Sequence, residues 1–383
     1  MALLASQVVC AAPFVPRDDA AVLERLPGKP GDPAALELRR LRAAVAAAPT
    51  DAGTAALLAR RYFDLAMAEG DPRYVGYAAA VLQPWPETVA APVETLVLHG
   101  MLRQYRHDFA RAMADFDLAL QSDPANTEAR AWRAAIMMVR ADYVAARREC
   151  ALLAEHATEL HATACVSYIE ATTGNARAAY KRLAAALARR ADVDPAFRVW
   201  ILTRLAEMAW RFGDLAVAEK HFQHGIALGI DDNFLLAAYA DFLLEQGRAA
   251  EVMPLLKGWA RSDTLLLRLA LAAHALKLAE GERYARTLGE RFSDAALRGE
   301  KLHQQEEARF LLELRSDARA AVTAASENYR AQREPRDALI LIEAALAARD
   351  PPAAAPALEW LETSGFEGAR MRQIALKLKA LKP

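Results

Sequence analysis

The sequence repeats with a period of 34 residues, and this period limits the possible fold more than any other feature. Residues of related type coincide when the chain is shifted by 34 positions: Gly100 with Ala134, Asp108-Phe109 with Asp142-Tyr143, Ala112 with Ala146, Phe116 with Cys150, Ala206 with Ala240, Ala218 with Val252, and Phe222 with Leu256. Such a period is typical of repeat proteins in which each unit is one pair of helices stacked on the next pair.

Each class of repeated residue has a steric role. Small residues are expected where two helices cross, at Gly100, Ala134, Ala206 and Ala240 on first helices and at Ala112, Ala146, Ala179 and Ala218 on second helices. Large apolar residues four positions later are expected to fill the layer between pairs: Phe116, Cys150, Leu183 and Phe222. Glycines spaced by 34 are expected to form left-handed turns between helices, at Gly213, Gly247 and Gly281.

The unit at residues 93–126 resembles the tetratricopeptide repeat family, most closely its poorly characterised bacterial members. The matching residues are Leu96, Gly100, Ala112, Phe116, Ala119 and Pro124. Further units are expected at residues 127–160, 160–194, 199–232, 233–266, 267–299 and 301–335. The resemblance implies an all-α fold, an α-solenoid in which about eight TPR-like helix-turn-helix repeats form a right-handed superhelix. It also implies a non-catalytic scaffold that binds another protein.

The chain divides into five expected segments. In order they are a possible signal-like segment (1–12), an extended lead-in (13–32), N-terminal helices with a degenerate repeat (33–92), the repeat array (93–335), and a degenerate repeat with a C-terminal capping helix (336–383). Within the third segment, prolines and turn residues predict helices at 33–48, 51–68 and 71–82.

The first twelve residues lack a basic start, so a frayed apolar terminus is the alternative to an export signal. Export to the periplasm is favoured over a cytoplasmic location, and lipidation of Cys10 is not expected.

Composition narrows the classes of partner. Alanine supplies much of the 54% apolar content and aromatic residues only 7%, which favours closely packed helices. The net charge is −1, from 48 basic and 49 acidic residues, and no basic stripe predicts a nucleic-acid partner. Apolar runs are too short for a transmembrane span. Partner identity, pathway and oligomeric state are left open.

Cys150 and Cys165 fall on neighbouring helices of consecutive repeats, so a disulfide between them is geometrically possible. Two buried thiols are the alternative. An oxidising compartment would favour the bond.

No constellation of residues predicts catalysis, a cofactor or a metal. A phosphate-binding loop is absent from the sequence, and so is the H-E-x-x-H order of zinc proteases. His221 and His224 share one predicted helix with Glu219 but have no further suitable ligand, so we expect solvated side chains. The protein is therefore expected not to be an enzyme.

A partner is expected in the concave groove, which first helices line in this family. The groove-facing residues are Tyr168, Trp200, Thr203, Glu207, Trp210, Phe234, Asp241 and Arg268. Large aromatic residues commonly anchor interfaces, whereas the alternative is that the tryptophans only fill space between repeats. The positions that bind a terminal carboxylate in some family members are apolar here: Val97, Met101, Ala131 and Ala135.

A second polar region lies near the C-terminus, where charged and amide side chains crowd one unit. It comprises Glu306, Glu307, Arg309, Asn328, Gln332, Arg333 and Glu334. A paired surface face is the plainest interpretation. The alternatives are a hydrolase site that would include His303, or a ligand-sensing regulatory module.

Overall fold

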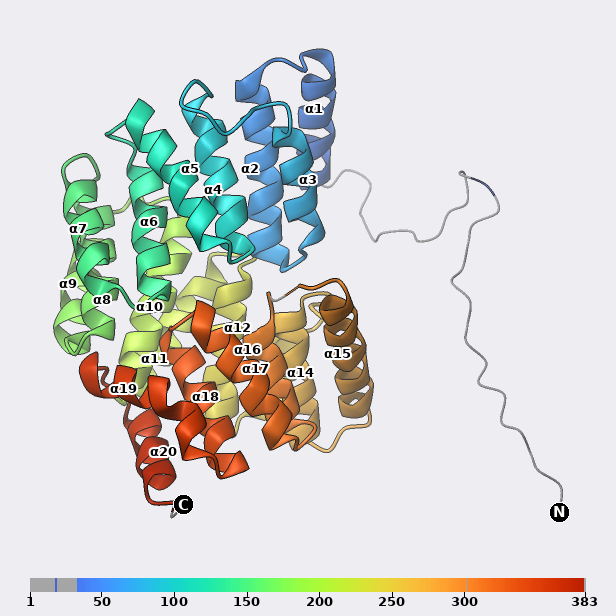
Figure 1. Cartoon of the computed structure of the whole chain (residues 1–383), viewed down its shortest axis with the longest axis vertical. Helices are drawn as coiled ribbons and strands as arrows, with labels where there is room; N and C mark the ends of the chain where they lie inside the picture. The colour runs from blue at the N-terminus through green and yellow to red at the C-terminus, as the bar shows by residue number, and fades with distance from the viewer. Residues whose placement is uncertain (1–17, 19–32, 301, 382–383) are drawn as a thin grey trace.

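The computed structural model describes residues 18, 33–300 and 302–381, and these form twenty α-helices and one short 3-10 helix. The predicted signal-like segment and most of the lead-in lie outside the described residues. Helices that follow one another in sequence pack as antiparallel pairs, and the pairs are stacked side by side (Figure 1). The predicted all-α fold, an α-solenoid of TPR-like helix pairs, is confirmed.

Eight helix pairs make up the stack, followed by an irregular C-terminal end. The first helices are α2 (Ala52–Glu69), α4 (Val93–Tyr105), α6 (Thr127–Val139), α8 (Glu159–Thr172), α10 (Pro195–Arg211), α12 (Asn233–Glu245), α14 (Asp263–Ala275) and α16 (Gln304–Glu313). The second helices are α3 (Arg73–Leu82), α5 (Phe109–Ser122), α7 (Tyr143–Ala154), α9 (Ala176–Ala188), α11 (Leu215–Ala227), α13 (Ala249–Leu255), α15 (Glu280–Leu297) and α17 (Ala318–Ala331). At the ends lie α1 (Pro33–Ala47), α18 (Pro335–Ala348), η1 (Pro351–Ala354), α19 (Ala355–Thr363) and α20 (Ala369–Lys379). None of the described helices combines the length and apolar character needed to cross a membrane.

The repeated small and large residues have the predicted roles in the core. Phe116 and Phe222 are fully buried, at 0% exposure. A methyl group added to Gly100 would lie 2.6 Å from the Phe116 ring, far inside contact distance. The absence of a side chain at Gly100 therefore lets α4 approach α5 across that ring.

Left-handed residues close most of the turns within the pairs, but the prediction for Gly281 is wrong. Gly213 and Gly247 have φ values of 84° and 71°, as predicted. Gly281 lies inside α15, and the left-handed residue of that turn is Lys277, at φ 56°. A Cβ atom at Gly281 would lie 3.2 Å from the backbone nitrogen of His274, so this glycine allows α14 and α15 to approach closely.

An aspartate follows the left-handed residue in several turns and caps the second helix. In each case its carboxylate accepts a hydrogen bond from the backbone N–H three residues later, which satisfies a donor that the helix leaves free. These caps are Asp108, Asp142, Asp214 and Asp317. Each such cap typically contributes about 1 kcal/mol to helix stability.

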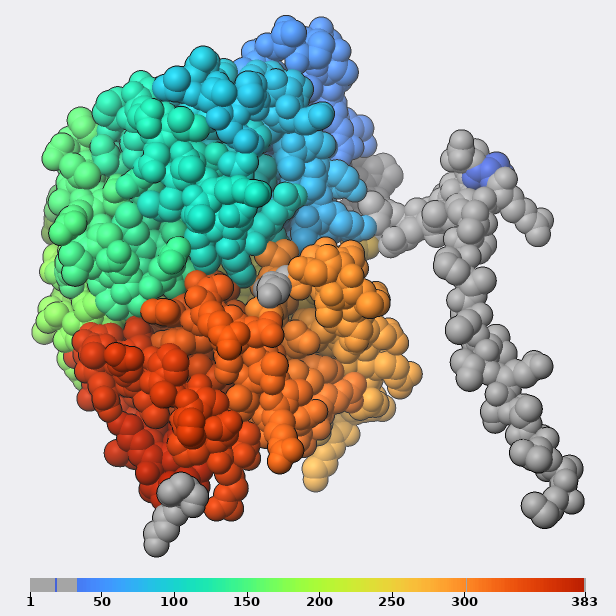
Figure 2. Space-filling view, in the orientation of Figure 1, coloured from blue at the N-terminus to red at the C-terminus, as the bar shows by residue number. Residues whose placement is uncertain are grey.

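The solenoid closes on itself, because its C-terminal helices contact the turns of earlier pairs. We call this contact between α4–α9 and α17–α20 the seam. Its hydrogen bonds include those of Gln332 with His107 (3.3 Å), Arg333 N–H with the Val139 carbonyl (2.7 Å), Trp360 Nε1 with the Tyr143 hydroxyl (2.7 Å), Ala176 N–H with Glu367 (2.6 Å), and the Tyr168 hydroxyl with Glu334 (2.9 Å). Figure 2 shows the blue-green and orange-red parts of the chain meeting along this border.

The backbones also approach one another closely at Gly174 and Gly365. Both glycines have left-handed φ values, 86° and 72°. A Cβ atom at Gly174 would lie 3.1 Å from the Gly365 carbonyl oxygen. The α8–α9 turn and the loop before α20 therefore depend on glycine both for their conformation and for their approach.

Candidate functional site

The structure brings together the two polar regions that the sequence kept apart. Tyr168 on α8 donates its hydroxyl hydrogen bond to Glu334 Oε1, at 2.9 Å. Asp241 on α12 forms an ion pair with Arg309 on α16, at 2.5 Å. Residues of the predicted groove thus face residues of the C-terminal polar region, on the inside of the closed solenoid.

Aromatic and arginine side chains form one cluster on this inner face. The rings of Tyr168 and Trp200 meet edge to face, with their centroids 6.0 Å apart. The Arg204 guanidinium lies 5.4 Å from the Tyr168 ring and 5.9 Å from the Trp200 ring, within the range of cation–π attraction. Arg204 also forms an ion pair with Glu207 at 3.0 Å. Glu207 is therefore placed beside the predicted aromatic residues.

The far end of this cluster faces solvent. Arg336, at the start of α18, lies over the Phe234 ring, 5.6 Å from its centroid. Phe234 is 41% exposed, and the side chain of Arg336 is 47% exposed. An exposed aromatic ring and an exposed cation thus lie side by side across the two halves of the chain. We call Tyr168, Trp200, Arg204, Phe234 and Arg336 the inner-face cluster.

Glu334 connects the cluster to the start of α18. Burial alone would raise the pKa of Glu334, but Arg336 and the Tyr168 hydroxyl outweigh it and lower that pKa below its ordinary value. Burial raises the pKa of the Tyr168 phenol well above its ordinary value. At neutral pH the contact is therefore a neutral phenol donating to a carboxylate.

Next to Glu334, Asp337 lies in a different electrostatic setting. It is 2% exposed and accepts hydrogen bonds from the Asn328 side chain and the Glu334 N–H, both at 2.9 Å. Burial, followed by the negative charge of Glu334, raises the pKa of Asp337 to about 7. The pKa values of the two carboxyl groups at the start of α18 are therefore shifted in opposite directions.

Two residues that were predicted to face the groove are instead buried, and the prediction for them is wrong. Thr203 is 2% exposed, and its hydroxyl donates to the Val199 carbonyl at 2.9 Å. Arg268 is 3% exposed and binds Asp241 at 2.7 Å. Arg268 lies between carboxylates of the neighbouring first helices, Asp241 of α12 and Glu306 of α16, and the Thr203 hydroxyl is bound within α10.

Asp241 and Trp210 also have partners within the protein. Burial alone would raise the pKa of Asp241, but Arg268 and Arg309 outweigh it and lower that pKa to about 2. Trp210 packs edge to face on Phe242, at 5.6 Å between centroids, and donates its indole N–H to a glutamate at the end of α12. Both residues hold α12 to its neighbours.

Sequence reasoning missed Arg204 and Arg336 as members of the site. Arg204 lies on α10, a first helix, directly after the predicted groove residue Thr203. Its place on a first helix could therefore have identified it from the sequence. Arg336 lies beyond the predicted array, and no local pattern connects it with Phe234, 102 positions earlier (336 minus 234).

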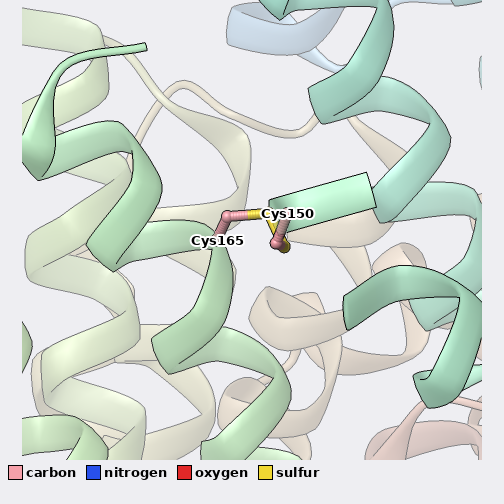
Figure 3. The surroundings of a disulfide bond; sticks show 2 residues. All are labelled: Cys150 and Cys165. Carbon is pink, nitrogen blue, oxygen red and sulfur yellow. A yellow bond between two sulfur atoms is a disulfide. The ribbon is translucent and has the colours of Figure 1, made fainter. Parts of the chain in front are cut away.

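Cys150 on α7 and Cys165 on α8 form a disulfide in the structure. Their Cα atoms are 5.7 Å apart. Figure 3 shows the two side chains pointing toward one another from neighbouring helices. The bond joins two consecutive repeats that also contribute Tyr143 and Tyr168 to contacts with the C-terminal helices.

Other candidate ligands have partners of their own. His221 Nε2 lies 2.9 Å from the Tyr180 hydroxyl, and Glu219 binds Arg248 at 2.7 Å. Within the described ranges, no three His, Cys, Asp or Glu side chains are placed to hold a metal ion. A cavity of about 750 Å³ is lined by Glu300 and Glu327, but not by His303.

Comparisons with known proteins concern the arrangement of helices alone. No family model matches the sequence, and no curated protein matches it. Among solved structures, the APC/C hetero-tetramer Cut9-Hcn1 is 14% identical with a TM-score of 0.42, over 90% of this chain and 52% of that chain. Yeast Tom70 is 12% identical with a TM-score of 0.42, over 91% of this chain and 78% of that chain. The human IFIT1 dimer with PPP-AAAA is 13% identical with a TM-score of 0.39, over 91% of this chain and 95% of that chain. The chain thus spans about half the length of the Cut9-Hcn1 chain, and no conclusion about function rests on these likenesses.

Proposed function

We propose that this protein is a non-catalytic scaffold that binds a peptide or helix of a partner protein at the inner-face cluster. One observation carries this proposal: Phe234 and Arg336 are 41% and 47% exposed, although both lie on the inner face. Aromatic residues, phenylalanine included, and arginine are enriched at protein interfaces relative to the rest of the surface.

The chemistry of the cluster limits the partner. An apolar side chain of the partner is expected to cover the Phe234 ring. A carboxylate next to that side chain is expected to bind Arg336, whose one ion pair within the described chain is with Glu334, at 3.1 Å. A guanidinium group has five N–H donors, so most of those of Arg336 remain available to a ligand.

The binding surface in this proposal is narrower than the groove predicted from the sequence. Trp200, Glu207 and Phe234 remain part of it, with Tyr168 packed edge to face on Trp200. Asp241, Arg268 and Trp210 hold α12 to its neighbours, and Thr203 is buried. Of the polar C-terminal region, Glu334 borders the partner site through its contacts with Tyr168 and Arg336, and a separate hydrolase site is not part of the proposal.

The test uses peptides selected from a random library on the intact protein, with affinities measured by fluorescence anisotropy. The variant Phe234→Ala/Arg336→Ala is expected to bind the selected peptides at least tenfold more weakly, because hot-spot truncations cost about 2 kcal/mol or more. The matched control is Leu376→Ala/Arg140→Ala, which removes an exposed apolar residue and an exposed arginine elsewhere. Equal affinities of wild type and the Phe234/Arg336 variant would remove the inner-face cluster from the proposal.

A further inference from the structure

A cavity at the seam, lined by none of the inner-face cluster residues, is a second candidate binding site. A cavity of about 750 Å³ opens between the N-terminal pairs and the C-terminal pairs. One wall comes from α3 and the α4–α5 turn, and the other from the turn before α16 and from α17. Cavities of about 300–1,000 Å³ are typical of small-molecule sites.

The N-terminal wall of this cavity is largely apolar. It contains Pro72, Val75, Gly76 and the Tyr105 ring, and Leu302 faces it from the other side. Gly76 lies in the middle of α3, and a Cβ atom added there would have no atom within 4 Å. The wall therefore has room beside it for an apolar group.

Neutral hydrogen-bonding groups line part of the cavity. His107, at the α4–α5 turn, has Nδ1 at 3.3 Å from the Gln332 side-chain nitrogen, which donates to it. Burial lowers the pKa of His107 to about 4, so the ring is neutral at neutral pH. With Nδ1 as acceptor, the ring carries its proton on Nε2, where it is a donor. Asn328, which is 2% exposed, lines the opposite wall.

The charged residues of the lining differ in their partners. Glu300 binds Arg298 at 2.8 Å, and Glu327 accepts a hydrogen bond from Gln304 at 2.8 Å. Arg106 and Arg330 are exposed, and throughout the described ranges neither guanidinium group has an ion pair or hydrogen bond. The cavity thus presents two arginines without partners and two glutamates that already have them.

We propose that this seam cavity binds a small organic monoanion, a carboxylate on an apolar body. The carboxylate would bind Arg106 and Arg330, since a guanidinium group matches a carboxylate with two parallel hydrogen bonds. The apolar body would lie against Val75 and Leu302. The two glutamates disfavour ligands with several negative charges, such as phosphates.

The ligand would connect the two halves of the solenoid. Arg106 belongs to the second pair and Arg330 to the eighth, so one carboxylate held by both joins α4 to α17. A ligand bound only when the seam is closed stabilises the closed form in proportion to the logarithm of its concentration. The site is independent of the proposed partner site, because it shares no residue with the inner-face cluster.

The test is isothermal titration calorimetry on the full chain with two probes, 2-naphthoate and octanoate. Saturable binding of one molecule per chain is expected for at least one probe. The neutral 2-naphthamide is expected to bind at least tenfold more weakly than 2-naphthoate, because it lacks the charge that both arginines attract.

Three variants separate the cavity from general surface binding. Arg106→Ala/Arg330→Ala is expected to weaken binding at least tenfold. Gly76→Leu, which fills the open space beside α3 with a good helix former, is expected to abolish it while both arginines remain. The control is Arg140→Ala, an exposed arginine 34 positions after Arg106 at the end of α6, which is expected to bind like wild type.

The proposal is overturned if neither probe shows saturable binding to wild type. It is also overturned if both the double arginine variant and Gly76→Leu bind as tightly as wild type. Circular dichroism melting of each variant checks that it is folded, so a loss of affinity is assigned to the cavity.

Discussion

The repeat stack and the seam hold the same helices by different means. In the stack, helices adjacent in sequence bury apolar residues against one another, as where Phe222 meets the Tyr239 and Phe242 rings at centroid distances of 5.2 and 5.6 Å. In the seam, residues more than 150 positions apart meet mainly through directed hydrogen bonds such as Tyr168 to Glu334. Apolar burial is the larger contribution per residue, so the seam should open before the stack unfolds.

The largest effect is expected from Phe222→Ala, in the middle of the stack. Removing a fully buried phenylalanine leaves a cavity and should cost about 3–5 kcal/mol of unfolding free energy. Urea denaturation followed by circular dichroism measures this. A loss under 1 kcal/mol would mean that the layer between pairs collapses easily around the site.

Removing the disulfide with Cys150→Ala/Cys165→Ala should have the next largest effect. The bond closes a loop of 15 residues, and loops of this length typically contribute about 3 kcal/mol. Denaturation of the variant and wild type under non-reducing conditions gives the difference. Non-reducing mass analysis should show the Cys150 and Cys165 peptides linked, whereas two alkylatable thiols would contradict the bond.

Asp241→Asn tests the polar network that joins α12 to α14 and α16. The pKa of Asp241 falls from 3.8 to about 2 on folding, so its charge contributes about 2 kcal/mol of stability. A depressed acid pKa stabilises the fold above pH 3.8, and the contribution is lost as the pH falls toward 2. The stability difference between wild type and variant should therefore be constant from pH 5 to 7 and shrink from pH 4 to 2. A difference that does not change with pH would assign the effect to packing.

Tyr168→Phe should have the smallest effect on global stability and a local effect on the seam. It removes one hydrogen bond to Glu334 but keeps the ring, which should cost about 1 kcal/mol. Relative to wild type, the variant should show faster amide hydrogen exchange in α18, with a larger increase there than in α10. The control is Tyr77→Phe, on an exposed tyrosine outside the seam. Unchanged exchange of α18 in Tyr168→Phe would show that this hydrogen bond does not hold the seam.

Most of the helix pairs could be predicted from the sequence, because the residues that form a pair lie within one repeat. The expected helices at 33–48, 51–68 and 71–82 differ from α1, α2 and α3 by at most two residues at either end. The wrong prediction of a left-handed turn at Gly281 also came from a pattern within one repeat. A small residue suits both a left-handed turn and a close helix crossing, and the period alone does not separate these roles.

The sequence by itself determined the stack, since the repeats carry their own small residues and apolar layer, and four of them carry an aspartate cap. Only the tertiary structure decided which distant residues meet, such as Phe234 with Arg336 and Arg106 with Arg330 at one cavity. The physical reason is that a solenoid's path is the sum of small rotations between successive pairs. No single repeat encodes that sum, so the seam between the early turns and the C-terminal helices is visible only in the folded chain.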